Sequence, residues 1–175
     1  MVERKRVLIT VKTYPLPSEK YQELVCTAGV LEDGSFVRLY PINFRYRPPY
    51  QWYKKYQWIE LDVEKNVNDA RKESYRPVLD SIRLIGPPLG TEERWAARRA
   101  VVLSRRATTM EELRDLQEAD GTSLGIVRPR VVTDFLAEPT DIDWKPEWRT
   151  LFMQMTLFAE AERKSLDKIP YRFSY

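Results

Sequence analysis

The segment of residues 38–58 combines eight aromatic and five basic residues and contains no acidic residue. Aromatic faces stack on unpaired bases, and the cations of Lys and Arg neutralise phosphates. The segment therefore predicts a surface for single-stranded or structured RNA or DNA. The residues expected to form it are Arg38, Tyr40, Arg45, Tyr46, Arg47, Trp52, Lys54 and Lys55.

The composition of this segment also fits a packed core or a protein interface. Tyr and Trp fill protein cores, where Arg often packs over their rings. Aromatic and Arg enrichment also marks protein–protein interfaces, so the loop that contains Pro48 and Pro49 could instead dock a partner protein. The sequence leaves packing and protein docking open beside nucleic-acid binding.

A second basic cluster lies in residues 92–106, which hold five Arg and two Glu. Thr91 is a suitable N-cap for a helix here. At 100° per residue, Arg94, Arg98 and Arg105 would fall within a stripe of about 40°. Such a stripe could follow a phosphate backbone. The same residues would also form an ordinary solvated face, or would pair with the acidic residues of 107–120.

Three carboxylates, Glu60, Asp62 and Glu64, alternate along a predicted strand and so share one face. Convergent carboxylates can hold Mg²⁺ for phosphodiester cleavage, which makes a metal-dependent nuclease the alternative enzymatic function. An amphipathic strand with one wet face gives the same pattern, and we expect these three residues to bind no catalytic metal.

Several chemistries are excluded by residue types that the chain lacks. It has no His, which rules out Ser-His-Asp triads, Cys-His dyads and His-based metal sites. A single Cys, Cys26, rules out an intrachain disulfide and a Cys-rich zinc site. The glycines match no phosphate-binding loop. No cofactor is implied, and catalysis is not the expected function.

Strands dominate the first half of the predicted structure. Asp33-Gly34 predicts a two-residue hairpin loop, which would pair Val30 with Val37 and Ala28 with Leu39. Cys26 would then share their core face, while Arg38 and Tyr40 would stand on the other face above Gly29 and Thr27. The expected strands are residues 5–12, 23–31, 36–40, 57–65 and 80–85.

Helical patterns follow this β-rich part. Helices are expected from Thr91 to about Arg105, from Thr109 to about Glu118 and from about Leu151, with an extended segment at 126–136 and a late strand at 169–175. The order of elements predicts an α+β fold with an N-terminal curved antiparallel sheet or small barrel, helices in the middle and C-terminal half, and a late C-terminal strand. We expect one domain over residues 1–175, β-rich in 1–85 and mixed helical in 91–175.

Four short strings resemble those of small prokaryotic proteins. They are Lys-Thr-Tyr-Pro at 12–15, Cys-Thr-Ala-Gly at 26–29, Arg-Leu-Tyr-Pro at 38–41 and Ile-Pro-Tyr-Arg-Phe-Ser-Tyr at 169–175. The resemblance implies a prokaryotic origin and brings no activity with it. A cytoplasmic protein is expected, because there is one Cys, no secretory signal and no apolar run long enough for a membrane helix. The abrupt end at Tyr175 suggests that related chains continue further.

Overall fold

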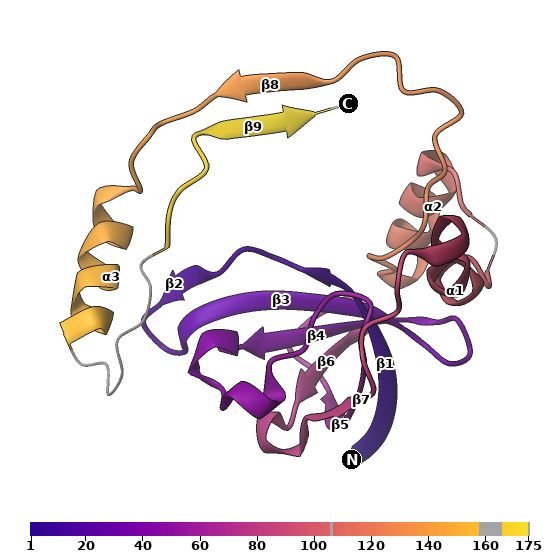
Figure 1. Ribbon diagram of the computed structural model, residues 1–175, viewed down its shortest axis with the longest axis horizontal. Helices are drawn as coiled ribbons and strands as arrows, with labels where there is room; N and C mark the ends of the chain where they lie inside the picture. Colours follow the sequence, from indigo (N-terminus) through magenta and orange to yellow (C-terminus); the bar gives the residue numbers. More distant parts are fainter. Residues whose placement is uncertain (106, 158–165, 175) are drawn as a thin grey trace.

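Five strands of the N-terminal half close into a small barrel (Figure 1). They are β1 (Val2–Lys12), β3 (Gln22–Leu31), β4 (Phe36–Ile42), β5 (Trp58–Lys65) and β6 (Ser74–Pro77). The ring runs β1-β3-β4-β6-β5 and closes because β5 also pairs with β1. The β4–β6 pair is parallel and the other pairs of the ring are antiparallel. Two short strands extend the sheet, β2 (Leu16–Ser18) on β3 and β7 (Arg83–Ile85) on β5.

The long first strand makes closure possible. Residues 2–8 of β1 pair with β5, and residues 7–12 pair with β3. A bulge between Ile9 and Val11 bends the strand between its two partners. The computed structural model describes residues 1–105, 107–157 and 166–174, and within them it confirms the expected α+β fold with an N-terminal barrel.

The barrel interior is filled by alternate residues of its strands. Those of β5 are Ile59, Leu61 and Val63, each fully buried, as the alternation of that strand predicts. Val37 and Leu39 of β4 join the same hydrophobic core. The inward face of β5 is therefore apolar and packed, and its opposite face carries the polar residues Glu60 and Asp62.

The register of the β3–β4 hairpin differs by one residue from the prediction. Leu31 and Ser35 close a three-residue loop in which Gly34 has φ 78°, so Val30 pairs with Phe36 and Ala28 with Arg38. The left-handed Gly34 forms the bulge that a three-residue hairpin needs, and this adds the one residue that shifts the pairing.

The shift turns β3 over. Thr27 and Gly29 face the interior beside Leu39 and Val37. The prediction that Cys26, Ala28 and Val30 share one face with Val37 and Leu39 is wrong, because Thr27 and Gly29 pair with those residues instead. Ala28 and Val30 are nevertheless buried as predicted, 8% and 1% exposed, on the opposite face of β3, and Cys26 is partly exposed. Crowding enforces this arrangement, because a Cβ atom at Gly29 would collide with the Val7 side chain and the Leu8 carbonyl.

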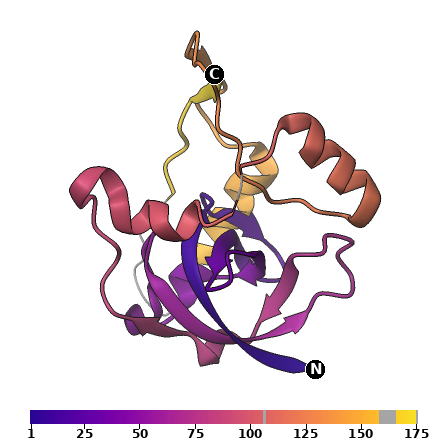
Figure 2. The same cartoon turned by 90° about the vertical axis from the view of Figure 1, so that its right-hand side faces the viewer.

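Three helices and a second small sheet follow the barrel: α1 (Glu92–Val102), α2 (Met110–Asp120), α3 (Pro146–Leu157), and β8 (Leu136–Pro139) paired with β9 (Tyr171–Ser174). Figure 1 shows α1 and α2 on the same side of the barrel, and the turned view of Figure 2 shows that they lie apart from each other. Helix α2 begins after Thr109 and ends at Gly121, close to the predicted bounds. Thr109 and Glu112 form a capping box at its start, and Gly121 ends it with φ 73°.

The remaining boundaries differ in detail from the predictions. Residues 126–135 carry only an isolated bridge, and the strand forms at 136–139. The segment expected as a strand at 80–85 forms one only at 83–85, after a 3₁₀ turn. The last helix begins at Pro146, before the expected start at Leu151, and the stretch up to Ala161 extends beyond the described residues, as does Tyr175. In the described part of the chain, no helix combines the length and apolarity needed to cross a membrane.

Candidate nucleic-acid interface

Part of the aromatic-basic segment at 38–58 closes one end of the barrel. Phe44 and Tyr53 are buried and meet edge to face with their ring centroids 4.9 Å apart. The Tyr53 hydroxyl lies 2.8 Å from Oγ1 of Thr27, and burial raises the pKa of this phenol well above its usual range. These two rings therefore pack as core residues and are closed to a ligand.

Arg45 is committed to a buried acid. The side chain of Glu23 on β3 has no exposed surface, and its two oxygens accept hydrogen bonds from the backbone N–H and Nε of Arg45, each at 2.6 Å. A buried carboxylate needs such partners, because burial otherwise strongly disfavours its charged form. Arg45 therefore neutralises the buried charge of Glu23. The composition of residues 38–58 gives no sign of this pairing, because Glu23 lies outside that segment.

Arg47 is largely covered and is paired with an acid at the surface. Its side chain is 15% exposed, its Nε donates to the side chain of Gln51 at 3.0 Å, and its Nη2 pairs with Asp80. Arg38 lies on the outer face of β4 as expected, half-buried, with Nη2 3.5 Å from the Cys26 sulfur. Tyr40 and Tyr46 are half-buried too. These positions stabilise the outside of the barrel and expose little surface to a ligand.

Two aromatic and two basic residues of the segment project into solvent. Tyr50 is 73% and Trp52 45% exposed, and Lys54 and Lys55 are exposed as well. A 3₁₀ turn over Pro49–Gln51 sets this pattern, since it turns Gln51 inward while Tyr50 and Trp52 point out. Trp52 Nε1 donates to the Arg47 carbonyl at 2.8 Å, and the indole lies beside Phe44 with the ring centroids 6.1 Å apart. These contacts hold the partly exposed indole in place.

Lys12, at the end of β1, completes this group. Its Nζ lies 3.5 Å from the centroid of the Phe44 ring and 3.4 Å from the carbonyl oxygen of Tyr53. Burial, with repulsion from the Lys55 ammonium, lowers the pKa of Lys12, and the attraction of the Glu23 carboxylate opposes this shift. Lys12 is linked to Trp52 through Phe44, whose ring centroid lies 6.1 Å from that of the indole. We call Lys12, Tyr50, Trp52, Lys54 and Lys55 the aromatic-basic surface.

Sequence reasoning missed Lys12 because the β1 bulge that redirects the end of the strand has no signature in the residue pattern. Tyr50 belonged to the aromatic count but not to the expected surface. Its exposure could have been predicted from its place directly after Pro48-Pro49, at the tip of a turn.

The predicted arginine stripe does not form. Arg94 lies in a left-handed first turn, with φ 54°, and Arg105 follows the end of α1 at Val102. The guanidinium of Arg98 stacks 4.1 Å from the Tyr56 ring centroid and donates to the Leu89 carbonyl at 2.9 Å. Because the three residues share no continuous helix, they present no common face. Arg106 lies outside the described residues.

The carboxylate row on β5 has the predicted common face but is neutralised by Arg4 on β1. The Arg4 guanidinium donates two hydrogen bonds to Asp62, at 2.8 and 3.1 Å, and lies 3.7 Å from Glu60. The hydrogen bond from Arg4 lowers the pKa of Asp62. Glu64 lies across from Val2. Over residues 1–105, 107–157 and 166–174, no cluster of acidic or Cys side chains has metal-site geometry.

Two family models cover the chain between them. A domain of unknown function (DUF8758) matches residues 3–104, which hold the barrel and α1. The protein belongs to this family. A second domain of unknown function (DUF8757) matches residues 106–175, from just before α2 to the end of the sequence. No curated protein and no solved structure matches the chain. The junction between the two matches falls at Arg105, immediately after α1.

Proposed function

We propose that the barrel binds single-stranded nucleic acid through the aromatic-basic surface. The observation that carries the proposal is the pairing of two exposed aromatic side chains with three neighbouring lysines at one end of the barrel. Bases stack on aromatic faces without regard to sequence, and ammonium groups neutralise phosphates. The expected ligand is therefore RNA or single-stranded DNA, bound with little sequence preference, in the cytoplasm that the single free Cys favours.

The charge distribution supports a phosphate ligand. Arg45 and Arg47 are paired with Glu23 and Asp80, respectively. Lys12 has Lys55 as a neighbour, and a phosphate placed between two ammonium groups would relieve their repulsion. The surface is also preformed, because the Trp52 indole is already hydrogen-bonded to the Arg47 carbonyl. A preformed ring loses little conformational entropy when a base stacks on it.

Fluorescence anisotropy with a labelled oligo(dT) or oligo(U) tests the proposal at several salt concentrations. We expect micromolar or weaker binding, with log K falling by about 0.7 per phosphate neutralised for each unit of log salt. Lys54→Ala and Lys55→Ala should each reduce that slope by about 0.7. Trp52→Ala should weaken binding by about 1–3 kcal/mol with little change of slope, because stacking releases no counterions.

Matched variants lie elsewhere on the chain. Trp95 is 52% exposed on α1, and Lys145 is exposed before α3. Trp95→Ala and Lys145→Ala should leave both affinity and slope unchanged. If no oligonucleotide binds at low salt, or if the control variants weaken binding as much as Trp52→Ala does, the proposal is wrong. A folded protein without oligonucleotide binding would favour a protein partner at this surface instead.

A further inference from the structure

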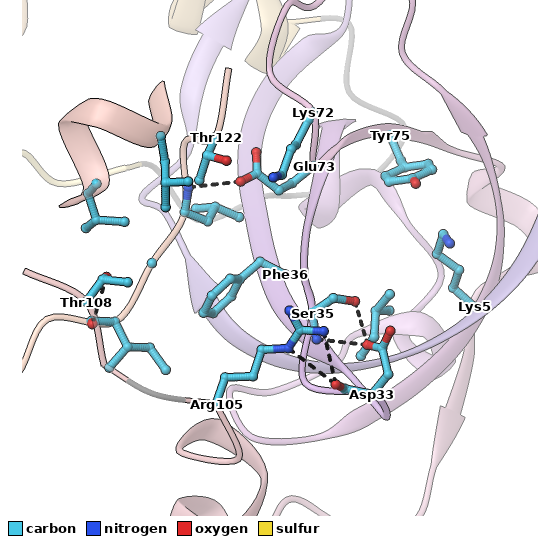
Figure 3. A pocket seen from close by; sticks show the side chains of 16 residues that line it. Lys5, Asp33, Ser35, Phe36, Lys72, Glu73, Tyr75, Arg105, Thr108 and Thr122 are labelled. Atoms are coloured by element: carbon cyan, nitrogen blue, oxygen red, sulfur yellow. Dashed lines mark hydrogen bonds between the residues drawn. The ribbon is translucent and has the colours of Figure 1, made fainter. Parts of the chain in front are cut away.

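A cavity of about 670 Å³ lies between the barrel and the α2 region, away from the aromatic-basic surface. Its walls come from both family matches: Lys5, Phe36 and Tyr75 belong to the barrel, and Leu113 and Ile126 to the second region. Figure 3 shows Phe36 pointing into the cavity, with Arg105 and Asp33 at one end and Lys72 and Glu73 at the other. Its volume is within the range of small-molecule sites, which often form between domains.

The two walls are fixed to each other by specific contacts. The carboxylate of Glu73, 6% exposed, accepts hydrogen bonds from the backbone N–H groups of Ser123 at 3.0 Å and Leu124 at 3.3 Å. Lys72 Nζ lies 2.5 Å from Asp120 at the end of α2. These contacts satisfy the charges at that end, so the cavity is a built space between two docked units.

The opposite end holds the cations Arg105 and Lys5 beside the Asp33 carboxylate, and Lys5 also pairs with Glu3 at 3.0 Å. Arg105 and Lys5 both lie close enough to lower the pKa of Asp33, although hydrogen bonds from Ser35 are the main cause of that shift. The Ser35 N–H at 2.8 Å and the Ser35 hydroxyl at 2.5 Å both donate to Oδ1 of Asp33. Within the described part of the chain, Arg105 donates two long bonds, of 3.4 Å each, to the Asp33 carbonyl. Its guanidinium therefore keeps strong donor capacity toward a ligand anion.

The rest of the wall is mainly apolar, with side chains such as Leu31, Phe36, Leu113, Leu124 and Ile126. An apolar wall with one cationic end suits a ligand of matching polarity. We propose that this cavity binds a small organic anion with an apolar body, its carboxylate, phosphate or sulfonate held by Arg105 and its body packed on Phe36. The site does not depend on nucleic-acid binding at the aromatic-basic surface.

Two fluorescent dyes that differ by one charged group can test the site. 8-Anilinonaphthalene-1-sulfonate carries a sulfonate, and N-phenyl-1-naphthylamine has the same rings without it. The sulfonate dye should bind saturably and raise the melting temperature, because it occupies a site of the folded protein. Arg105→Gln should weaken the sulfonate dye about tenfold, the loss of one charge-assisted hydrogen bond, and leave the neutral dye unchanged. Phe36→Ala should weaken both dyes.

Two control variants locate the dye. Arg114 is exposed on α2 and lies outside the cavity wall, so Arg114→Ala removes the same charge without touching the site. Phe173 is 54% exposed on β9, where a dye could also adsorb. Neither Arg114→Ala nor Phe173→Ala should alter either dissociation constant. The proposal is overturned if the sulfonate dye fails to saturate, if Arg105→Gln leaves it unchanged, or if Phe173→Ala releases it.

Discussion

Removal of the Arg45 side chain should destabilise the fold, because Arg45 pairs with the buried carboxylate of Glu23. The composition of residues 38–58 instead predicts that Arg45 binds a ligand. In Arg45→Ala, the buried carboxylate of Glu23 loses the Nε donor at 2.6 Å and keeps the backbone N–H donor at 2.6 Å. Loss of one partner of a buried ion pair costs about 3–5 kcal/mol. The retained N–H bond places the expected loss of unfolding free energy near the lower end, at about 3 kcal/mol.

Urea unfolding followed by circular dichroism measures this loss. The midpoint should fall with the slope unchanged, because the amount of surface exposed on unfolding stays the same. For a chain of this size, about 3 kcal/mol corresponds to a fall of about 6–12 °C in melting temperature. Addition of Glu23→Gln should recover part of the loss, since the neutral amide is cheaper to leave with one partner.

A matched exposed position separates stability from binding. Lys54→Ala should leave the urea midpoint unchanged, because Lys54 is exposed and has no side-chain role in the core. Arg45→Ala, measured where it is still folded, should bind oligonucleotide as the parent does. The reasoning is refuted if Arg45→Ala keeps the parent midpoint and weakens oligonucleotide binding, since Arg45 would then act on the ligand and not on Glu23.

Two further predictions concern the junction between the barrel and α2. Gly121→Ala should lower the free energy of unfolding by more than the backbone cost of an alanine in the left-handed region, about 1–2 kcal/mol. The added Cβ atom would lie 2.5 Å from the Ala70 carbonyl oxygen. Gly86 has φ 62° and open space around it, so Gly86→Ala should lower the free energy of unfolding, measured in the same urea titration, only by that backbone cost. Hydrogen bonds from Lys72 and Thr122 lower the pKa of Asp120 to about 2 from its ordinary 3.8, so the stability that this carboxylate contributes is complete above about pH 5 and is lost as pH falls through 2. The difference in melting temperature between Asp120→Asn and the parent should therefore be constant above about pH 5 and should disappear below about pH 2.

The fold class could be predicted because it depends on local patterns. Alternation along β5 identified its buried face, and Thr109 and Gly121 marked the ends of α2 through capping chemistry that acts within a few residues. The hairpin was placed correctly, but its register was not. Asp-Gly suits both a two-residue and a three-residue loop, and the choice is made by the crowding of Gly29 against Val7, a contact between different strands.

The prediction of the candidate surface named the right segment but included several residues that the fold places elsewhere. The cause is again contact between residues that lie far apart in the sequence. Lys54, Lys55 and Trp52 are exposed as expected. Arg45 is bound to Glu23, a residue 22 positions earlier, and nothing between them in the sequence signals the contact. The predicted arginine stripe failed because it assumed one regular helix through Arg105, which lies beyond the end of α1.

The acids that decide which cations are free therefore come from outside the basic segment. Residues 38–58 contain no acid, yet the fold brings Glu23 to Arg45 and Asp80 to Arg47. Both arginines lie within reach of a carboxylate from another strand or turn. The planar guanidinium group of Arg matches the geometry of a carboxylate and therefore favours such pairing. The lysines at 54 and 55 lie on the exposed loop before β5, where the end of β1 brings the Lys12 ammonium close to Lys55. A run of residues without acids thus indicates a binding surface only at the cations that do not pair with acids from the rest of the fold. Substitution of Lys54 or Lys55 should therefore change the salt dependence of oligonucleotide binding, and substitution of Arg45 or Arg47 should not.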